Sequence, residues 1–283
     1  MTKIHIVPDD VVATAPKLEH RALGAQVLQA WLGNFVSIFY LSPLSMGVPG
    51  SPLAAAPARG GVPVLFPQFA DRGLLPKHGF VRTARWNLVE EQVLHDAHTL
   101  RYGLSIQPND YPAWPHACEL NLIAEAKPDA LVFALQVRNS GADPFSWTGG
   151  LHPYFSAPDL LTCSALGLEG LGVQDRYDAH LQIESQGKLR WTPSPFERLY
   201  DACPPVILDM GNYSLLLSAS GFDQWMIWNP GEAGAGALAD LPAGDWRRFV
   251  CVEPVRVDRP VVLAPGETFD GHLRIQITER DRH

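Results

Sequence analysis

The chain has 283 residues, of which 46% are hydrophobic and 18% are charged, and this balance excludes an intrinsically disordered protein. A formal net charge of −8 at pH 7 argues against a nucleic-acid-binding surface, although a few local arginines can still hold a small anion. The N-terminus MTKIHIVPDD has no apolar signal core, and no apolar run approaches membrane-spanning length, so we expect a cytoplasmic protein.

Short strand-like runs separated by turn signals fill most of the chain. The 25 prolines and 24 glycines leave little room for long helices. Residues 23–42 are ambiguous by pattern and are assigned to strands. The runs CELNLIAEA (118–126) and ALVFALQVRNSG (130–141) flank a Pro-Asp turn, which predicts a β-hairpin.

Five further runs continue this pattern to the C-terminus: YSLLLSASG, QWMIWNP, FVCVEPV, PVVLAPGE and HLRIQITE. The Gly- and Ala-rich segment 229–246 has strand-like runs on both sides, which favours a long loop within one domain over a linker. The pattern predicts an all-β protein, a sandwich or barrel, forming a single domain over residues 1–283.

Four cysteines lie far apart without a CxxC spacing, which argues against a cysteine zinc site and, in a chain of this size, favours free thiols. The motifs GxSxG, HExxH, GxGxxG after a strand, and a phosphate loop ending in GK[ST] are all absent. Neither a serine or cysteine nucleophile nor a metal site is therefore expected.

An irregular segment, residues 59–86, concentrates glycines, prolines, His78 and several arginines. Arg59 precedes two glycines whose backbone N–H groups could form an anion nest. Together with Arg82, it offers guanidinium groups that bind two phosphate oxygens at once. The alternatives are solvated surface charges for the arginines and a structural turn histidine for His78.

Two residues outside that segment combine chemistry with an unusual context. His152 follows two glycines, which allow close approach of a ligand or another strand, and precedes a proline that favours extended backbone. A histidine there can act as a general acid, or can be structural. Glu253 closes an apolar run, where a carboxylate with a raised pKa suits a general base. The alternative is a strand-end carboxylate that reaches solvent.

Several segments together resemble the hexose-6-phosphate mutarotase branch of the aldose 1-epimerase family. They occur in the family's order: ARGGVPVLFPQF (58–69), LPKHGFVRTARW (75–86), LHPYF (151–155), ERLY (197–200), FDQWMIWNPG (222–231) and FVCVEPV (249–255). Each motif is short, but the ordered set is specific. The resemblance implies a large antiparallel β-sandwich, the galactose mutarotase-like supersandwich, and interconversion of sugar anomers without a cofactor.

The resemblance also implies roles for individual residues. Glu253 is the expected base for the anomeric hydroxyl, and His152 the expected acid for the ring oxygen. Substrate-binding roles are expected for six residues: His78, Arg59, Arg82, Gln68, Asp223 and Glu197.

Two positions depart from the family pattern: HPYF replaces an HTYF-like motif, and Glu197 stands where related sequences usually have aspartate. They leave the reaction type unchanged and bear on substrate choice. The expected partner is a phosphosugar, and neither nucleic acid nor a membrane is expected. The alternatives are a mutarotase of an unphosphorylated aldose and a sugar-binding module without catalysis. The two arginines disfavour the first, and the presence of both His152 and Glu253 disfavours the second.

Overall fold

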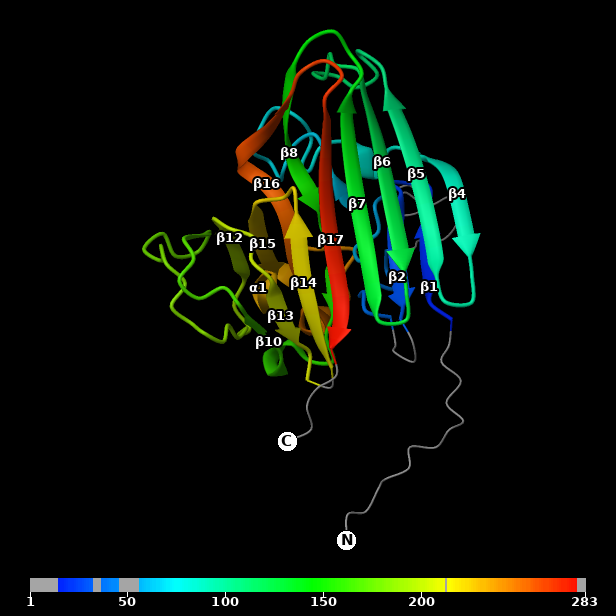
Figure 1. The fold of residues 1–283 in the computed structure, drawn as a ribbon. Coiled ribbons are helices and arrows are strands. Elements are labelled where there is room, and N and C mark those ends of the chain that lie inside the picture. The colour runs from blue at the N-terminus through cyan, green and yellow to red at the C-terminus, as the bar shows by residue number, and fades with distance from the viewer. Residues whose placement is uncertain (1–14, 33–36, 46–55, 212, 279–283) are drawn as a thin grey trace.

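The residues that the structure describes form two large antiparallel β-sheets and a small two-stranded sheet (Figure 1). The computed structural model describes residues 15–32, 37–45, 56–211 and 213–278. The expected all-β antiparallel sandwich is confirmed. The small sheet pairs β1 (Lys17–Arg21) with β2 (Gln26–Trp31).

The first large sheet has eight strands, and its central strands alternate buried and more exposed residues as a half-buried sheet requires. Strands β6 (Cys118–Ala126) and β7 (Ala130–Asn139) form the hairpin that the sequence predicts, closed by a hydrogen bond from the Lys127 N–H to the Ala130 carbonyl. The order is β10 (Ser164–Leu166), β13 (Val206–Asp209), β14 (Ser214–Ser220), β17 (Thr268–Thr278), β7 (Ala130–Asn139), β6 (Cys118–Ala126), β5 (His98–Ile106) and β4 (Asn87–Val93).

The second large sheet has seven strands and lies behind the first in Figure 1. Its long strand β16 (Phe249–Leu263) also pairs with the short β9 (Tyr154–Ser156). The other strands, in order, are β11 (Val173–Asp175), β12 (Phe196–Tyr200), β15 (Gln224–Asn229), then β16, β8 (Phe145–Leu151) and β3 (Val64–Leu65).

The main core lies between the two large sheets, and β16 shows which residues face it. Val250 and Val252 belong to the same buried cluster as Phe133 of β7. Because side chains alternate along a strand, Cys251 and Glu253 point to the opposite face of the seven-stranded sheet. Cys251 accordingly belongs to a separate cluster. The candidate site lies on this outer face.

Three sequence expectations are adjusted by the structure. FVCVEPV and the first four residues of PVVLAPGE belong to one strand, β16, whose register shifts between Arg256 and Val261. The segment 229–246 is a connection within the fold, as expected, but it contains helix α1 (Gly231–Ala235) and the start of a 3-10 helix at 245–248. Of residues 23–42, strand β2 is confirmed, residues 33–36 lie outside the described residues, and residues 37–41 form only isolated bridges.

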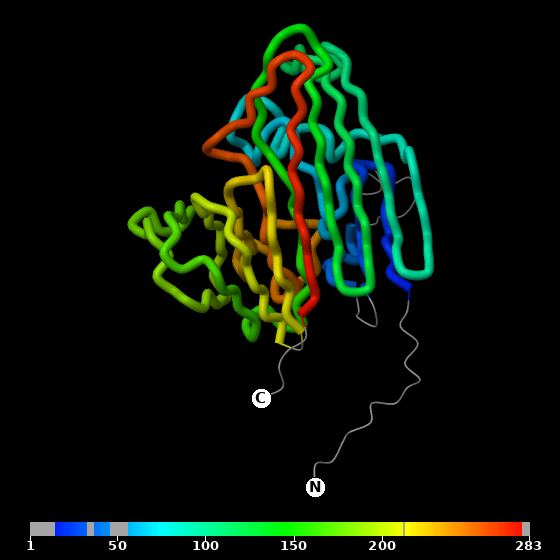
Figure 2. Tube along the Cα trace, in the orientation of Figure 1, coloured from blue at the N-terminus to red at the C-terminus, as the bar shows by residue number. Residues whose placement is uncertain are grey.

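The tube view shows how loops surround this architecture (Figure 2). The yellow-green chain between β11 and β12 projects at the left of the view. The short 3-10 helices at 81–83 and 160–162 lie in other connections. None of the helices formed by the described residues is long and apolar enough to cross a membrane. All four cysteines are free thiols, in agreement with the sequence analysis.

Candidate active site

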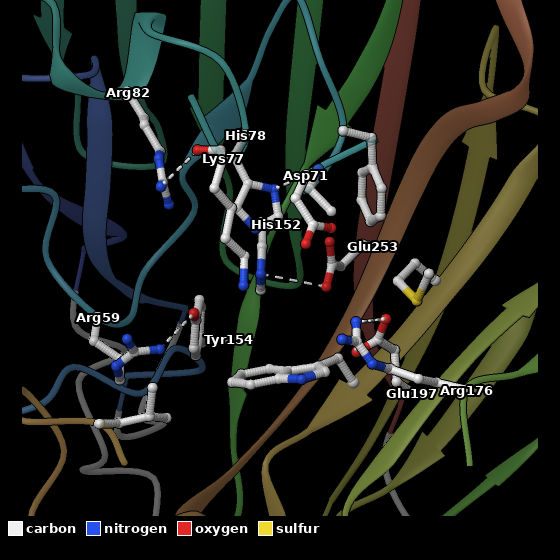
Figure 3. Close-up of a pocket in the computed structure, with 15 residues that line it drawn as sticks. Arg59, Asp71, Lys77, His78, Arg82, His152, Tyr154, Arg176, Glu197 and Glu253 are labelled. Carbon is white, nitrogen blue, oxygen red and sulfur yellow. Dashed lines mark hydrogen bonds and ion pairs between the residues drawn. The ribbon is translucent and has the colours of Figure 1, made fainter. Parts of the chain in front are cut away.

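A cavity of about 200 Å³ opens on the outer face of the seven-stranded sheet. Loop residues from the irregular segment and side chains from β9, β12, β15 and β16 surround it (Figure 3). Its lining includes six of the eight residues that the sequence analysis assigned to the site: Arg59, His78, Arg82, His152, Glu197 and Glu253.

Strand register brings the cavity's side chains together. Glu197 pairs across β12 and β15 with Trp228, Trp228 pairs with Cys251 of β16, and Cys251 pairs with Tyr154 of β9. Glu253 lies two residues farther along β16, on the same face as Cys251. A single row of paired residues across β12, β15, β16 and β9 therefore forms much of the cavity floor, although these strands are distant in sequence.

The two glycines before His152 let a neighbouring strand approach, rather than a ligand. Both have positive φ angles, 150° at Gly149 and 152° at Gly150. A Cβ atom at Gly150 would lie 2.2 Å from the Pro254 carbonyl oxygen, and one at Gly149 would lie 2.0 Å from the Leu65 carbonyl oxygen. Only glycine fits at this spacing. The close contact holds β8 against β16 and sets His152 beside Glu253.

His152 and Glu253 form the central pair of the site, with Nε2 and Oε1 3.4 Å apart (Figure 3). The two residues are only 7% and 1% exposed. Burial raises the pKa of Glu253 well above its usual range, and the Glu197 carboxylate raises it further. Burial lowers the pKa of His152 well below its usual range, and nearby His78 and Arg82 add to this effect. At neutral pH, we therefore assign one proton to the pair as a whole.

The environment of Glu253 differs from the sequence expectation in one respect. We expected it to close a strand, with solvent contact as the alternative. The strand instead continues to Leu263, so Glu253 lies within β16, and its Oε2 atom is buried without a hydrogen-bond partner among the described residues. The solvent-facing alternative is excluded.

Aromatic neighbours hold the His152 imidazole in place. The Tyr154 ring stacks on it, with centroids 4.8 Å apart and an interplanar angle of 6°. Trp228 approaches it edge-on at 6.1 Å. The His152 backbone N–H also donates to the Pro63 carbonyl, at 2.9 Å. The imidazole plane is therefore fixed before any substrate binds.

His78 faces His152, with ring centroids 5.6 Å apart. The Ala70 backbone N–H donates to His78 Nδ1 at 3.2 Å, so Nδ1 must carry a lone pair. Burial lowers the pKa of His78 to about 3, and Arg82 and Lys77 contribute repulsion. A neutral imidazole with Nδ1 as acceptor carries its proton on Nε2. His78 is therefore a fixed hydrogen-bond donor.

Three cations line the same side of the cavity, and they differ in how far they are neutralised. Arg59 donates through Nε to Asp240 at 2.6 Å and through Nη1 to the Tyr154 hydroxyl at 3.5 Å. Among the described residues, Arg82 donates only to the Lys77 backbone carbonyl, at 2.8 Å. Within the described part of the chain, neither Arg82 nor Lys77 has an acidic partner. The excess positive charge therefore comes mainly from Arg82 and Lys77.

The anion nest expected beside Arg59 does not form. The Gly61 backbone N–H donates to the Tyr40 carbonyl at 2.8 Å, and both glycines are buried. Gly60 packs so closely on Tyr40 and Leu41 that a Cβ atom would lie 2.3 Å from the Tyr40 carbonyl oxygen. The glycine pair serves chain packing.

Glu197 lines the cavity opposite Arg59, Lys77 and Arg82. It forms an ion pair with Arg176, in which Oε1 and Nη1 are 3.1 Å apart (Figure 3). Gln68 and Asp223 do not line the cavity. The Gln68 amide bonds to the backbone of Ala70 and Leu75 and so organises the loop. Asp223 is held by Arg256 and Arg259, at 2.9 and 2.6 Å.

Sequence reasoning did not assign four charged or hydroxyl-bearing residues that line the cavity: Asp71, Lys77, Tyr154 and Arg176. Lys77 and Tyr154 lie inside the motifs that the sequence analysis singled out, so their position was a usable signal. Trp228 lies in another such motif, FDQWMIWNPG, where the sequence allows either stacking on a sugar or a core position, and it also lines the cavity. Arg176 stands in a loop with no motif, and only the fold brings it to the cavity.

Comparisons with known proteins point to one family. Residues 17–276 match the family model described as aldose 1-epimerase. The chain is 28% identical over 263 residues to a "Putative glucose-6-phosphate 1-epimerase" of Cenchrus ciliaris, covering 89% of this chain and 78% of that protein. A protein of the same name from Escherichia coli strain K12 is 28% identical over 201 residues, covering 69% of this chain and 66% of that protein.

Solved structures share the fold. The YeaD protein of Salmonella typhimurium, described as a "putative mutarotase", has a TM-score of 0.82 at 23% identity, covering 94% of this chain and 88% of that chain. The galactose 1-epimerase of Lactobacillus acidophilus NCFM has a TM-score of 0.66 at 12% identity, covering 96% and 92%.

Proposed function

This chain belongs to the aldose 1-epimerase family, and from that premise we propose that it interconverts the α and β anomers of a hexose 6-phosphate. The names of its relatives from Cenchrus ciliaris and Escherichia coli support glucose 6-phosphate as the substrate class. The observation that carries the proposed chemistry is the 3.4 Å separation of His152 and Glu253 in a cavity with excess positive charge on one side.

In the proposed reaction, Glu253 removes the proton from the anomeric hydroxyl O1. The C1–O1 bond becomes a carbonyl as the C1–O5 bond breaks, and His152 delivers a proton to the ring oxygen O5. The open aldehyde turns about its C1–C2 bond. Ring closure on the other face returns one proton to His152 and takes one from Glu253, which restores the starting pair.

The shifted pKa values suit this exchange. An exposed carboxylate is a weak base at neutral pH, whereas burial raises the proton affinity of Glu253. Burial likewise makes the protonated form of His152 a stronger acid than an exposed imidazolium. His78 supports the reaction as a neutral donor through Nε2, to the ring oxygen or to a sugar hydroxyl.

The phosphate is proposed to bind at the cation-rich side of the cavity. Arg82 and Lys77 carry uncompensated charge there, and Arg59 adds a guanidinium fixed by Asp240. A phosphate dianion neutralises this excess, and arginine offers it paired donors. Glu197 lies across the cavity, where a carboxylate suits sugar hydroxyls better than phosphate.

Anomer equilibration of glucose 6-phosphate and of free glucose, each followed with and without the protein, tests this function. We expect strong acceleration for the phosphorylated sugar and weak acceleration for the free one. Equal acceleration of both would identify a general aldose mutarotase, and no acceleration of either would favour a sugar-binding module.

A further inference from the structure

A third potential metal ligand lies beside the proposed proton-transfer pair. His152, Cys251 and Glu253 each offer one ligand atom, and these three atoms lie within 4.8 Å of one another. All three residues are buried. The proposed sugar chemistry uses only the imidazole and the carboxylate, so it leaves the thiol without a role.

The distance between His152 and Glu253 suits a tetrahedral divalent cation. In zinc sites the metal lies about 2.0–2.2 Å from nitrogen and oxygen ligands, so neighbouring N and O ligands are roughly 3.3 Å apart. His152 Nε2 and Glu253 Oε1 are 3.4 Å apart. Cys251 and Glu253 share a face of β16 because they are two residues apart, and the sulfur lies within 4.8 Å of the ligand atoms of both His152 and Glu253.

One further observation and one charge argument point to a ligand here. Glu253 Oε2 is buried without a hydrogen-bond partner among the described residues, although the residue is only 1% exposed. A thiolate and a carboxylate together also balance the charge of a divalent cation, and such compensation is what a buried ion needs. The mixed N, S and O donor set favours zinc or a similarly thiophilic ion over magnesium or calcium.

We propose that His152 Nε2, Cys251 Sγ and Glu253 bind a thiophilic divalent cation such as Zn²⁺, which inhibits the enzyme. A cation at this point occupies the lone pairs that would otherwise move protons to and from the sugar. His152 and Glu253 line the cavity, which gives an entry path to them and room for a fourth ligand, water or substrate, and Cys251 lies beneath them. The inhibition part of this proposal rests on the proposed function, whereas the metal site itself does not.

A second cluster provides an internal contrast. His20, Glu91 and His98 also have ligand atoms within 4.8 Å of one another. There, His98 Nδ1 accepts from the Leu18 backbone N–H at 3.0 Å, so its Nε2 carries a proton and donates to Glu91. That tautomer cannot ligate a metal through Nε2, and the cluster contains no sulfur.

Cobalt absorption spectroscopy tests the metal site without any need for turnover. Co²⁺ added to the intact, metal-free protein should produce a thiolate-to-cobalt charge-transfer band and tetrahedral d–d bands. Cys251→Ser should abolish the charge-transfer band. Cys203→Ser is the matched control, because Cys203 is the most accessible of the four thiols and lies outside the site, and it should keep the band. A missing band in the wild-type protein, or a band that survives Cys251→Ser, overturns the proposal.

Zinc inhibition tests the consequence. The rate of each variant with Zn²⁺ is compared with the rate of the same variant in EDTA. The Zn²⁺ concentration that halves the rate should rise at least tenfold in Cys251→Ser and stay unchanged in Cys203→Ser. Equal zinc sensitivity in both variants contradicts the inhibition. If Cys251→Ser fails to fold, the same measurements are made on Cys251→Ala. Glu253→Gln then gives a second test, because it should lose the tetrahedral d–d bands of bound Co²⁺. A cobalt band in a protein that does not equilibrate glucose 6-phosphate would leave the site standing and reject the proposed function.

Discussion

Arg59 Nε lies 2.6 Å from Asp240 Oδ1, so the arginine that precedes the glycine pair already has a carboxylate partner in the free protein. Both side chains are largely shielded, with 17% and 24% of their surfaces exposed. The Asp240 contact fixes the guanidinium but also cancels much of its charge. Arg82, whose side-chain hydrogen bond among the described residues goes to the Lys77 backbone carbonyl, retains its charge.

Because Arg82 keeps more of its charge than Arg59, we expect the two substitutions to lower the use of a phosphosugar by different amounts. A charge-assisted contact contributes about 1.5–3 kcal/mol, or roughly a 10- to 150-fold change in binding. We expect Arg82→Ala to lower kcat/KM for glucose 6-phosphate by an amount in this range, Lys77→Ala and Arg59→Ala to lower it less, and none to change the rate with free glucose.

Arg72→Ala is the matched control, because Arg72 pairs with Asp258 outside the cavity. The measurement is the ratio of kcat/KM for the two sugars in each variant. Parallel losses for both sugars would show that the arginines are structural. Inorganic phosphate should inhibit the wild-type protein by competition at the same place.

Glu253→Gln should fold normally and lose on the order of 100-fold or more in rate, the usual scale for removing a general base. The amide keeps the shape of the buried side chain but cannot take a proton. Anomerisation kinetics at saturating substrate measure the loss, and thermal unfolding checks the fold. Near-wild-type turnover in a folded variant would rule out the base role.

His152→Asn should reduce the rate on a similar scale, because the amide cannot deliver a proton to the ring oxygen. His180→Asn and His116→Asn are the controls. His180 is exposed, and His116 packs against Trp114 and Phe145, away from the cavity. Both should retain the wild-type rate. Equal losses in all three variants would indicate a folding effect.

The rate should be nearly constant over a broad pH range around neutrality. Because the pKa of His152 is lowered, the pair gains a second proton only well below the usual histidine value of about 6.5. Because the pKa of Glu253 is raised, the pair loses its single proton only well above the usual carboxyl range. The profile should therefore fall on both sides of a plateau.

Measurement of kcat is preferable to kcat/KM here, because a sugar phosphate itself titrates near pH ~6. His152→Asn should change the acid side of the profile. A single titration with a midpoint near pH ~6.5 in the wild-type protein would contradict the shifted pair.

Gly150→Ala should destabilise the protein by roughly 2–4 kcal/mol and reduce activity, because the new Cβ meets the Pro254 carbonyl oxygen and moves β16. Gly266→Ala is the matched control. Its φ angle is also positive, at 82°, but no atom lies within 4 Å of the added carbon, so backbone strain of about 1 kcal/mol is expected. Denaturant unfolding compares the two variants, and similar losses would argue against the close strand contact.

The sequence by itself determined the fold class and most of the strands. Alternation in residues 118–126 and 130–139 and the turn between them are local signals, and they produce the observed hairpin β6–β7. The ordered motifs likewise identified six residues that line the cavity. Local pattern succeeds here because side-chain alternation and turn chemistry depend on neighbouring residues alone.

Only the tertiary structure decided which of these residues meet and in what electrostatic state. The pairing of His152 with Glu253 follows from the register of β8, β9 and β16, and the partner of Arg59 comes from a distant loop. Gln68 and Asp223, chosen from motifs, point to other partners. Register between strands far apart in sequence is set by the packing of the whole sheet, and pKa values follow from the resulting burial, so neither can be read from local sequence.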